Sequence, residues 1–180
     1  MALLTLYHGT THDFAEIDIM RGKPFKDFGR GFYATEVYGH ARNLALRNRD
    51  IELRRLKRRG ITCEVTPWLY TFEFDESKLE SLNVKRFDSA NKDWVQFIVL
   101  NRTNEAPQHG YDVVIGATAN DVTSRTAQLY MAGEYGDVGS DEAIEFFLSR
   151  IQPEHLPHQF FFGTERAANL LTLIGRCEVQ

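Results

Sequence analysis

Cysteine and long apolar runs are scarce in this sequence, and each scarcity excludes a class of protein. The two cysteines, Cys63 and Cys177, lie far apart and belong to no Cys-x-x-Cys pair, so neither a disulfide framework nor a zinc site is indicated. No apolar run approaches the ~20 residues of a transmembrane helix. The N-terminal stretch also lacks the basic flank of a signal peptide. We therefore expect a soluble, cytoplasmic protein that binds neither a membrane nor a metal ion.

Positive charge is not in excess either. The net charge of −4 and the pI near 5.9 exclude an electrostatic attraction of the whole protein to nucleic acid or to anionic membranes. A local basic patch remains open. With 43% hydrophobic and 12% aromatic residues over 180 positions, the chain is of globular type, and we predict a single domain spanning residues 1–180.

Apolar periodicity predicts interspersed strands and helices. Strands are expected at residues 5–10, 67–74, 84–87, 112–115, 158–163 and 171–174. Helices are expected at residues 37–59, 91–102, 122–132 and 143–151, with a shorter helix ending near Met20. Gly60 and Gly116 are read as stops for the elements before them. Because strand-helix-strand units do not repeat, we predict an α+β fold of short, largely antiparallel strands.

The predicted helix at residues 37–59 has two contrasting faces. Its expected buried stripe consists of Ala41, Leu44, Ala45, Ile51, Leu53 and Leu56. Its polar side carries Arg42, Arg47, Arg49, Arg54, Arg55, Lys57, Arg58 and Arg59. Such a face is either solvated, with cations placed favourably near the helix C-terminus, or a contact for phosphates or an acidic partner.

Two short stretches place chemically useful side chains at strand ends. The apolar run before His8 ends in Gly9, and a glycine there permits close approach of another backbone or a ligand. Gly29 and Gly31 precede a second apolar run that carries Tyr33. We interpret the pair as an imidazole and a phenol facing one cleft, bordered by the loop at residues 21–30. The alternative is two strand-turn junctions with a hydrogen-bonded histidine and a core tyrosine.

Several other residues are read as structural. The remaining histidines show no metal spacing and are interpreted as surface or loop residues: His12, His40, His109, His155 and His158. Asn101 and Arg102 could reach a cofactor phosphate, but a capping asparagine and a surface arginine are the simpler interpretation. The tripeptide Asp27-Phe28-Gly29 is interpreted as a coincidental likeness to a kinase motif.

Three motifs in order resemble a known enzyme family. His8-Gly9-Thr10, Gly29-Arg30-Gly31-Phe32-Tyr33 and the strand opening on Gln159 resemble the ADP-ribosyltransferases of the diphtheria-toxin-like and poly(ADP-ribose)-polymerase-like branch. The stretch 111–116, followed by Asn120-Asp121, is similar to a bacterial family of unknown function with this fold. The resemblance implies an ADP-ribosyltransferase-like split sheet of short, mostly antiparallel strands with surrounding helices.

The resemblance also implies a use for each motif. NAD would serve as ADP-ribose donor without a redox role, and cleavage of its nicotinamide-ribose bond passes through an oxocarbenium-like ribose. His8 would hydrogen-bond an adenine-ribose hydroxyl, Gly9 the carboxamide through its backbone, and Thr10 the ribose or carboxamide. Tyr33 would stack on nicotinamide. Gly31 and Tyr38 complete the expected cofactor-binding residues, and Arg30 is an auxiliary candidate.

Gln159 departs from the family pattern, which has a glutamate there. A glutamine can accept a ribose hydroxyl through its carbonyl but brings no charge, so polymer elongation is not expected and mono-ADP-ribosylation is. The expected catalytic set is His8, Tyr33 and Gln159. Glu165 is an auxiliary candidate that could supply the missing carboxylate if the turn after Gly163 folds it towards the cleft; otherwise it is a solvent-facing residue at a helix start.

We therefore expect a mono-ADP-ribosyltransferase that binds NAD, releases nicotinamide and modifies a macromolecular acceptor, either protein or nucleic acid. The resemblance implies a bacterial toxin of a toxin-antitoxin or defence pair, with an antitoxin protein as a further partner. Two alternatives stay open. One is a non-catalytic module that binds NAD or ADP-ribose; the other is a nucleic-acid-directed enzyme that uses the basic helix between Arg42 and Arg59.

Overall fold

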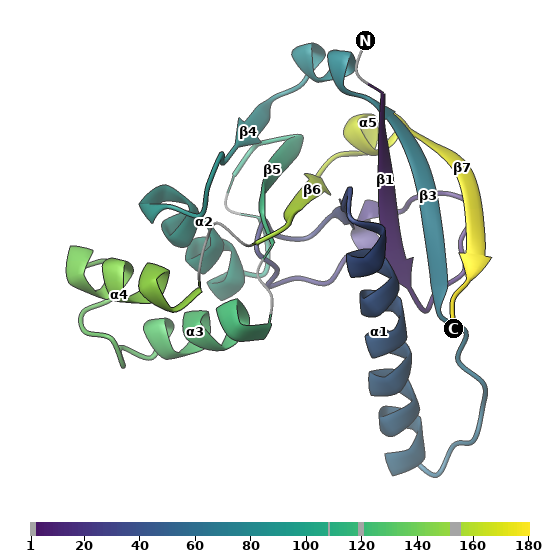
Figure 1. The fold of residues 1–180 in the computed structure, drawn as a ribbon, viewed down its shortest axis with the longest axis horizontal. Coiled ribbons are helices and arrows are strands. Elements are labelled where there is room, and N and C mark those ends of the chain that lie inside the picture. Colours follow the sequence, from purple (N-terminus) through teal and green to yellow (C-terminus); the bar gives the residue numbers. More distant parts are fainter. Residues whose placement is uncertain (1–2, 108, 119–120, 152–155) are drawn as a thin grey trace.

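The strands form two sheets that meet along one edge (Figure 1). The computed structural model describes residues 3–107, 109–118, 121–151 and 156–180. One sheet has the order β1 (Leu3–Thr10), β3 (Trp68–Asp75) and β7 (Leu171–Glu178), all antiparallel. The other has the order β2 (Phe32–Ala34), β6 (His158–Phe162), β5 (Val113–Ala117) and β4 (Val84–Arg86), with only β4 and β5 parallel. The predicted α+β class is confirmed.

A backbone bridge joins the two sheets. Tyr7 on β1 donates its N–H to the carbonyl of Thr35 at 2.7 Å and accepts from the Thr35 N–H at 3.0 Å. Because Thr35 directly follows β2, this bridge holds the end of β1 beside the end of β2. The prediction that two early strand ends lie together is therefore confirmed at the level of the backbone.

Residue alternation explains how the sheets pack. On β5 and β6, Val114 and Phe161 belong to a core shared with helices, whereas Phe160 and Phe162 belong to a core shared with the other sheet. Successive side chains of a strand point to opposite faces, so this second sheet is buried on both sides. The alternation predicted for residues 67–74 is confirmed, with Phe72 fully inside the core between the sheets.

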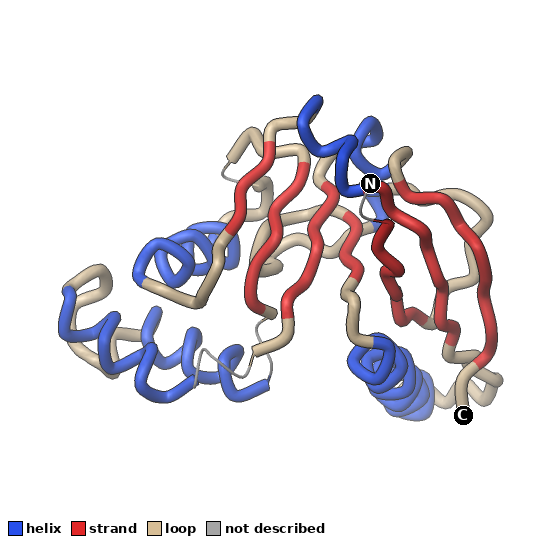
Figure 2. Tube along the Cα trace, turned by 45° about the horizontal axis from the view of Figure 1, so that its top comes forward, coloured by secondary structure: helices blue, strands red, loops and turns tan. Residues whose placement is uncertain are grey.

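Helices α2 (Lys92–Thr103), α3 (Asp121–Met131) and α4 (Asp141–Ile151) cluster on one face of the second sheet (Figure 2). The Asn91 side chain caps α2 by accepting from the Trp94 N–H, as N-cap residues do. Trp94 itself is fully buried and donates its indole N–H to the Ala117 carbonyl at 3.2 Å. The remaining helical segments are η1 (Ile19–Arg21), η2 (Glu76–Ser81) and α5 (Glu165–Ala168).

The long helix α1 (Tyr38–Arg58) begins beside the junction of the sheets, and its C-terminal half projects beyond the strands (Figure 1). Its bounds agree with the prediction, but its predicted buried stripe is wrong in part. Ala41 and Ala45 are buried against β1, whereas Leu44, Ile51 and Leu53 are exposed. Ile51 and Leu53 lie in the half of the helix that projects beyond the strands, where no core is available to pack against.

Other expectations need correction. Gly116 does not end its strand: β5 continues through it to Ala117, and the missing side chain leaves room for the ring of Phe87. The expected early helix is reduced to the single turn η1, and the last strand extends to Glu178. Asn120, part of the stretch that is similar to the bacterial family, lies outside the described residues.

Candidate functional site

A cleft opens where β1, β2 and the start of α1 meet. Its volume is about 80 Å³. The lining residues are Tyr7, His8, Gly9, Tyr33, Ala34, Thr35, His40, Ala41, Leu44, Thr118 and Gln159. The cleft thus brings together His8, Tyr33 and Gln159, which the sequence places on separate strands.

His8 projects from β1 and is half-buried, with its ring 4.4 Å from the ring of Phe32. Its Nδ1 lies 2.6 Å from the Tyr33 carbonyl oxygen; because a carbonyl only accepts, Nδ1 carries the proton. Burial lowers the pKa of His8 to about 4, against the opposing effect of this hydrogen bond. His8 is therefore neutral at pH 7, and its Nε2 presents a lone pair without a hydrogen-bond partner among the described residues.

Tyr33 on β2 uses its hydroxyl to hold the preceding loop. The hydroxyl donates to the Gly29 carbonyl at 2.6 Å and accepts from the Phe28 N–H at 3.1 Å. Its ring contacts the Phe161 ring edge-on, 5.2 Å between centroids, and burial raises the pKa of the phenol. The ring lines the cleft, while the hydroxyl is committed to the loop.

Gln159 stands near the start of β6, two positions before Phe161, which pairs with Tyr33. Since alternate residues share a face, Gln159 and Tyr33 project to the same side of the sheet. The Gln159 amide nitrogen donates to Asp27 Oδ2 at 2.9 Å and lies 3.4 Å from the Ala117 carbonyl oxygen. With the nitrogen held by acceptors, the carbonyl oxygen is the atom of Gln159 that remains for a ligand.

Asp27 is a site residue that sequence reasoning missed. It is 6% exposed, and its Oδ1 accepts from the Nε and Nη2 of Arg102 at 2.8 and 2.6 Å. Arg102 also donates to Ser124 Oγ at 3.3 Å, so the interpretation of Arg102 as a surface residue is wrong. Asp27 and its partners lie far apart along the chain. The only local signal was an acidic residue directly before the buried Phe28.

His40 is a second imidazole in the cleft, and its interpretation as a surface residue is also wrong. It lies in the first turn of α1 and lines the cleft with His8 and Gln159. Its Nδ1 is shielded from solvent and has no hydrogen-bond partner among the described residues. Burial lowers its pKa. His109 is likewise half-buried, with Nε2 2.8 Å from the Phe28 carbonyl oxygen.

The glycines of the motifs are required by packing. A Cβ on Gly9 would lie 1.8 Å from the Ala41 carbonyl oxygen, and one on Gly31 would lie 2.4 Å from the Phe161 ring. Gly9 therefore lets α1 approach β1 closely enough to form the wall of the cleft. The neighbouring Thr10 accepts from the His12 N–H at 3.1 Å.

The remaining predicted site residues lie outside the cleft lining. Tyr38 is 48% exposed and touches Tyr7 ring to ring at 5.4 Å, at the start of α1. Arg30 pairs with Glu105 at 3.3 Å. Glu165 is exposed at the start of α5, beyond the end of β6 opposite to the end that carries Gln159. The structure therefore brings Gln159, and not Glu165, to His8 and Tyr33.

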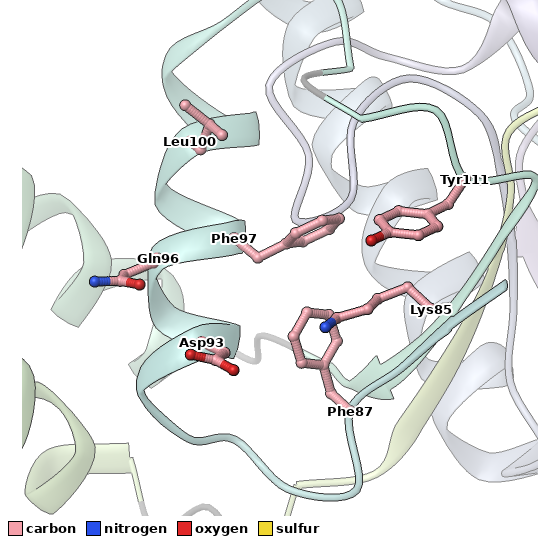
Figure 3. Close-up of a pocket in the computed structure, with 7 residues that line it drawn as sticks. All are labelled: Lys85, Phe87, Asp93, Gln96, Phe97, Leu100 and Tyr111. Atoms are coloured by element: carbon pink, nitrogen blue, oxygen red, sulfur yellow. The ribbon is translucent and has the colours of Figure 1, made fainter. Parts of the chain in front are cut away.

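A larger and more open recess of about 270 Å³ lies between β4 and α2 (Figure 3). The rings of Phe87, Phe97 and Tyr111 surround it, and the Lys85 ammonium lies over the Phe87 ring, 4.9 Å from its centroid. This recess shares no residue with the cleft.

Within the described part of the chain, no cluster of His, Cys, Asp and Glu could hold a metal ion. The described residues also include no helix that is long and apolar enough to cross a bilayer.

One protein family, DUF3990, described as a protein of unknown function, matches residues 4–173. No curated protein and no solved structure matches the chain.

Proposed function

We propose an activity for this chain, which belongs to the DUF3990 family of proteins of unknown function: it binds NAD, releases nicotinamide and transfers one ADP-ribose to a macromolecular acceptor. The observation that carries the proposal is the convergence of His8, Tyr33 and Gln159 on one cleft. Two of these residues come from one sheet and the third from the other, so the cleft exists only because of the tertiary fold.

The chemistry of the three side chains supports this use. The Nε2 lone pair of neutral His8 can accept from a ribose hydroxyl. The ring of Tyr33 offers an apolar surface for the nicotinamide. The carbonyl oxygen of Gln159 can accept from the 2′-hydroxyl of the other ribose and face the positive charge that develops as nicotinamide leaves.

The network behind Gln159 supports transfer of a single unit. Asp27 brings a carboxylate next to the Gln159 amide, but Arg102 donates twice to that carboxylate and offsets its charge. No full negative charge therefore faces the ribose from this side. A site that orients the ribose through a neutral carbonyl is suited to one transfer step rather than to activation of successive acceptors for a polymer.

NAD binding must widen the cleft. Its volume of about 80 Å³ is below the ~300 Å³ at which ligand pockets typically begin. The loop that reaches Tyr33 is held by the bonds of its hydroxyl to Gly29 and Phe28, and Phe28 is fully buried. We expect the earlier part of this loop, which includes exposed Phe25, to move and to select or cover the acceptor.

We further propose that the protein acts in the cytoplasm as the toxin of a bacterial toxin-antitoxin or defence pair. An antitoxin protein that covered His8 and Gln159 would block NAD at its entrance. This role rests on the resemblance of the motifs to ADP-ribosyltransferases.

Incubation of the purified protein with labelled NAD and a bacterial lysate tests the activity. Wild-type protein should release nicotinamide and label a macromolecule, and digestion of the product with protease or nuclease should identify the acceptor class. Tyr33→Ala and Gln159→Ala should abolish labelling, whereas the matched control Glu165→Ala should retain it. Folded wild-type protein that binds NAD but releases no nicotinamide would instead support a non-catalytic binding module.

The basic side of α1 favours nucleic acid as a second candidate acceptor. Arg54 and Arg58 are exposed on the same helix whose first turns line the cleft through His40 and Leu44, and Arg59 is exposed directly after its end. Phosphates bound along this helix would lead a strand towards the reacting ribose.

A further inference from the structure

We propose that His40 is the catalytic base that removes the proton from the acceptor during transfer. This inference rests on the proposed function and adds a residue to it. The described residues that line the cleft include no carboxylate, so a nucleophile with an O–H or N–H group needs another base there.

The geometry points to His40 because its imidazole is uncommitted. It lines the cleft together with His8, Tyr33 and Gln159. Its Nδ1 is shielded from solvent and forms no hydrogen bond to any residue that the structure describes. Buried polar atoms are almost always hydrogen-bonded in folded proteins. An orphaned imidazole nitrogen at a cleft wall is therefore a candidate for a bond that forms only when substrate is present.

The other titratable groups in and behind the cleft are already engaged. His8 donates through Nδ1 to the Tyr33 carbonyl, and the Tyr33 hydroxyl is held by Gly29 and Phe28. Asp27 is buried against Arg102.

The protonation state of His40 suits the role. Burial lowers its pKa, and no charged neighbour contributes to the shift, so the imidazole is neutral at pH 7 and able to take up a proton. Unlike His8, it has at Nδ1 no carbonyl partner from the described part of the chain that would fix one tautomer. A histidine that is neutral at the working pH is the usual general base in enzymes.

The acceptor oxygen or nitrogen forms a bond to C1′ of the nicotinamide ribose, and the C1′–N bond breaks with its electron pair passing to nicotinamide, which leaves neutral. The acceptor proton passes to a ring nitrogen of His40, and the resulting imidazolium loses it to solvent. NAD is neither oxidised nor reduced.

The test compares two nucleophiles in wild type and His40→Gln. Lysate macromolecules must lose a proton on attack, whereas azide is already an anion and needs no base. His40→Gln should reduce labelling of lysate by about 100-fold or more. Its reaction with azide, measured as nicotinamide release, should stay within about threefold of wild type. His12→Gln, an exposed histidine outside the cleft, is the matched control and should retain both reactions.

The outcomes separate the inference from the proposed function. Equal labelling by wild type and His40→Gln would overturn the role of His40 and leave the transferase intact. Loss of the azide reaction together with labelling would also overturn it, because His40 would then position NAD rather than accept a proton. A wild type that cleaves no NAD would overturn both. If His40→Gln does not fold by circular dichroism, His40→Asn provides the same comparison.

Discussion

The Nδ1 atom of His8 lies 2.6 Å from the backbone carbonyl oxygen of Tyr33. This single bond connects β1 of one sheet to β2 of the other, next to the backbone bridge between Tyr7 and Thr35. It also fixes the tautomer of His8 and turns Nε2 away from the strand. The same contact thus serves the junction of the sheets and the presentation of a hydrogen-bond acceptor in the cleft.

Because His8 is buried in its neutral form, acid should destabilise the fold through this residue. Its folded pKa of about 4 lies below the unfolded value of 6.5, so the unfolded state takes up the proton first. The contribution of neutral His8 to the free energy of unfolding is complete above pH 6.5 and is lost as the pH falls towards 4. The shift corresponds to about 3 kcal/mol at most.

Urea unfolding of wild type and His8→Gln at pH 7 and pH 4.5 measures this effect. The difference in unfolding free energy between the two proteins should shrink by about 2 kcal/mol at the lower pH. His12→Gln, which removes an exposed imidazole, should show no such pH dependence. Parallel pH curves for wild type and His8→Gln would contradict the buried neutral state.

Restoring the glutamate of the related enzymes should harm this protein. In Gln159→Glu, a carboxylate replaces the amide that donates to Asp27 at 2.9 Å, so a hydrogen bond becomes a repulsion between like charges. We expect a loss of about 2 kcal/mol, or a Tm lower by roughly 4–8 °C. Thermal unfolding measures the loss, and nicotinamide release should not rise.

A double-mutant cycle tests whether Asp27 is the cause. Asp27→Asn alone leaves the guanidinium of Arg102 without its carboxylate and should cost about 3 kcal/mol. Combined with Gln159→Glu, it removes the repulsion and supplies a new amide donor, so the double variant should be at least ~1 kcal/mol more stable than the sum of the single effects. Simple additivity would show that the two side chains do not interact.

The sequence predicts local structure here better than it predicts the site. The alternation of apolar and polar residues around Phe72 predicts β3 correctly, because the strand period alone decides which side chains face the core. The stripe on α1 fails at Ile51 and Leu53, because periodicity reports which residues could be buried and not how far the sheet extends beneath the helix. Leu44 is exposed for another reason, since it lines the cleft. Asp27 was missed for a related reason: its partners Arg102 and Gln159 are distant in sequence, and only the fold brings them together.

Gly9 should tolerate no side chain. In Gly9→Ala the new Cβ would meet the Ala41 carbonyl oxygen at 1.8 Å, and both atoms belong to elements with fixed backbones. Displacement of α1 from β1 should cost about 2–3 kcal/mol. Gly39→Ala, on α1 itself, is the matched control, since nothing lies within 4 Å of its added Cβ. It should be neutral or stabilising by up to ~1 kcal/mol. Denaturation curves of the two variants test the contrast.

Asp112 anchors the end of the second sheet away from the cleft. Its carboxylate accepts from the Asn83 N–H and the Thr164 hydroxyl at 2.8 Å each and from Arg166. The Arg166 guanidinium, acting against burial, lowers the pKa of Asp112 to about 2. Asp112→Asn should therefore destabilise the protein by roughly 1–3 kcal/mol above pH 4. The deficit should shrink as the pH falls from 3.8 towards 2.

Activity measurements on Asp112→Asn distinguish a purely structural role of Asp112 from a role in the cleft. If the protein stays folded at the assay temperature, Asp112→Asn should bind NAD and release nicotinamide like wild type. Calorimetric NAD titration alongside thermal unfolding would show this. A large loss of NAD affinity in a folded variant would mean that the far end of the sheet also shapes the cleft.

The basic end of α1 offers the clearest test of the acceptor class. Glu52 accepts from Arg55 at 2.6 and 2.9 Å, whereas Arg54, Arg58 and Arg59 are exposed and form no ion pair within the described residues. If the acceptor is nucleic acid, the triple change of these three arginines to Glu removes phosphate contacts and adds repulsion. Nuclease-sensitive labelling at about 0.15 M salt should then fall at least tenfold.

Nicotinamide release in the absence of acceptor should be unchanged in the triple variant, because none of the three residues lines the cleft. Charge reversal of Arg125 and Arg150, exposed on α3 and α4, is the control for a general change in net charge and should leave labelling intact. The loss in the triple variant should also diminish as salt is raised, since screening weakens every phosphate contact. Undiminished nucleic-acid labelling would rule out α1 as the docking surface, and label removed only by protease would identify a protein acceptor instead.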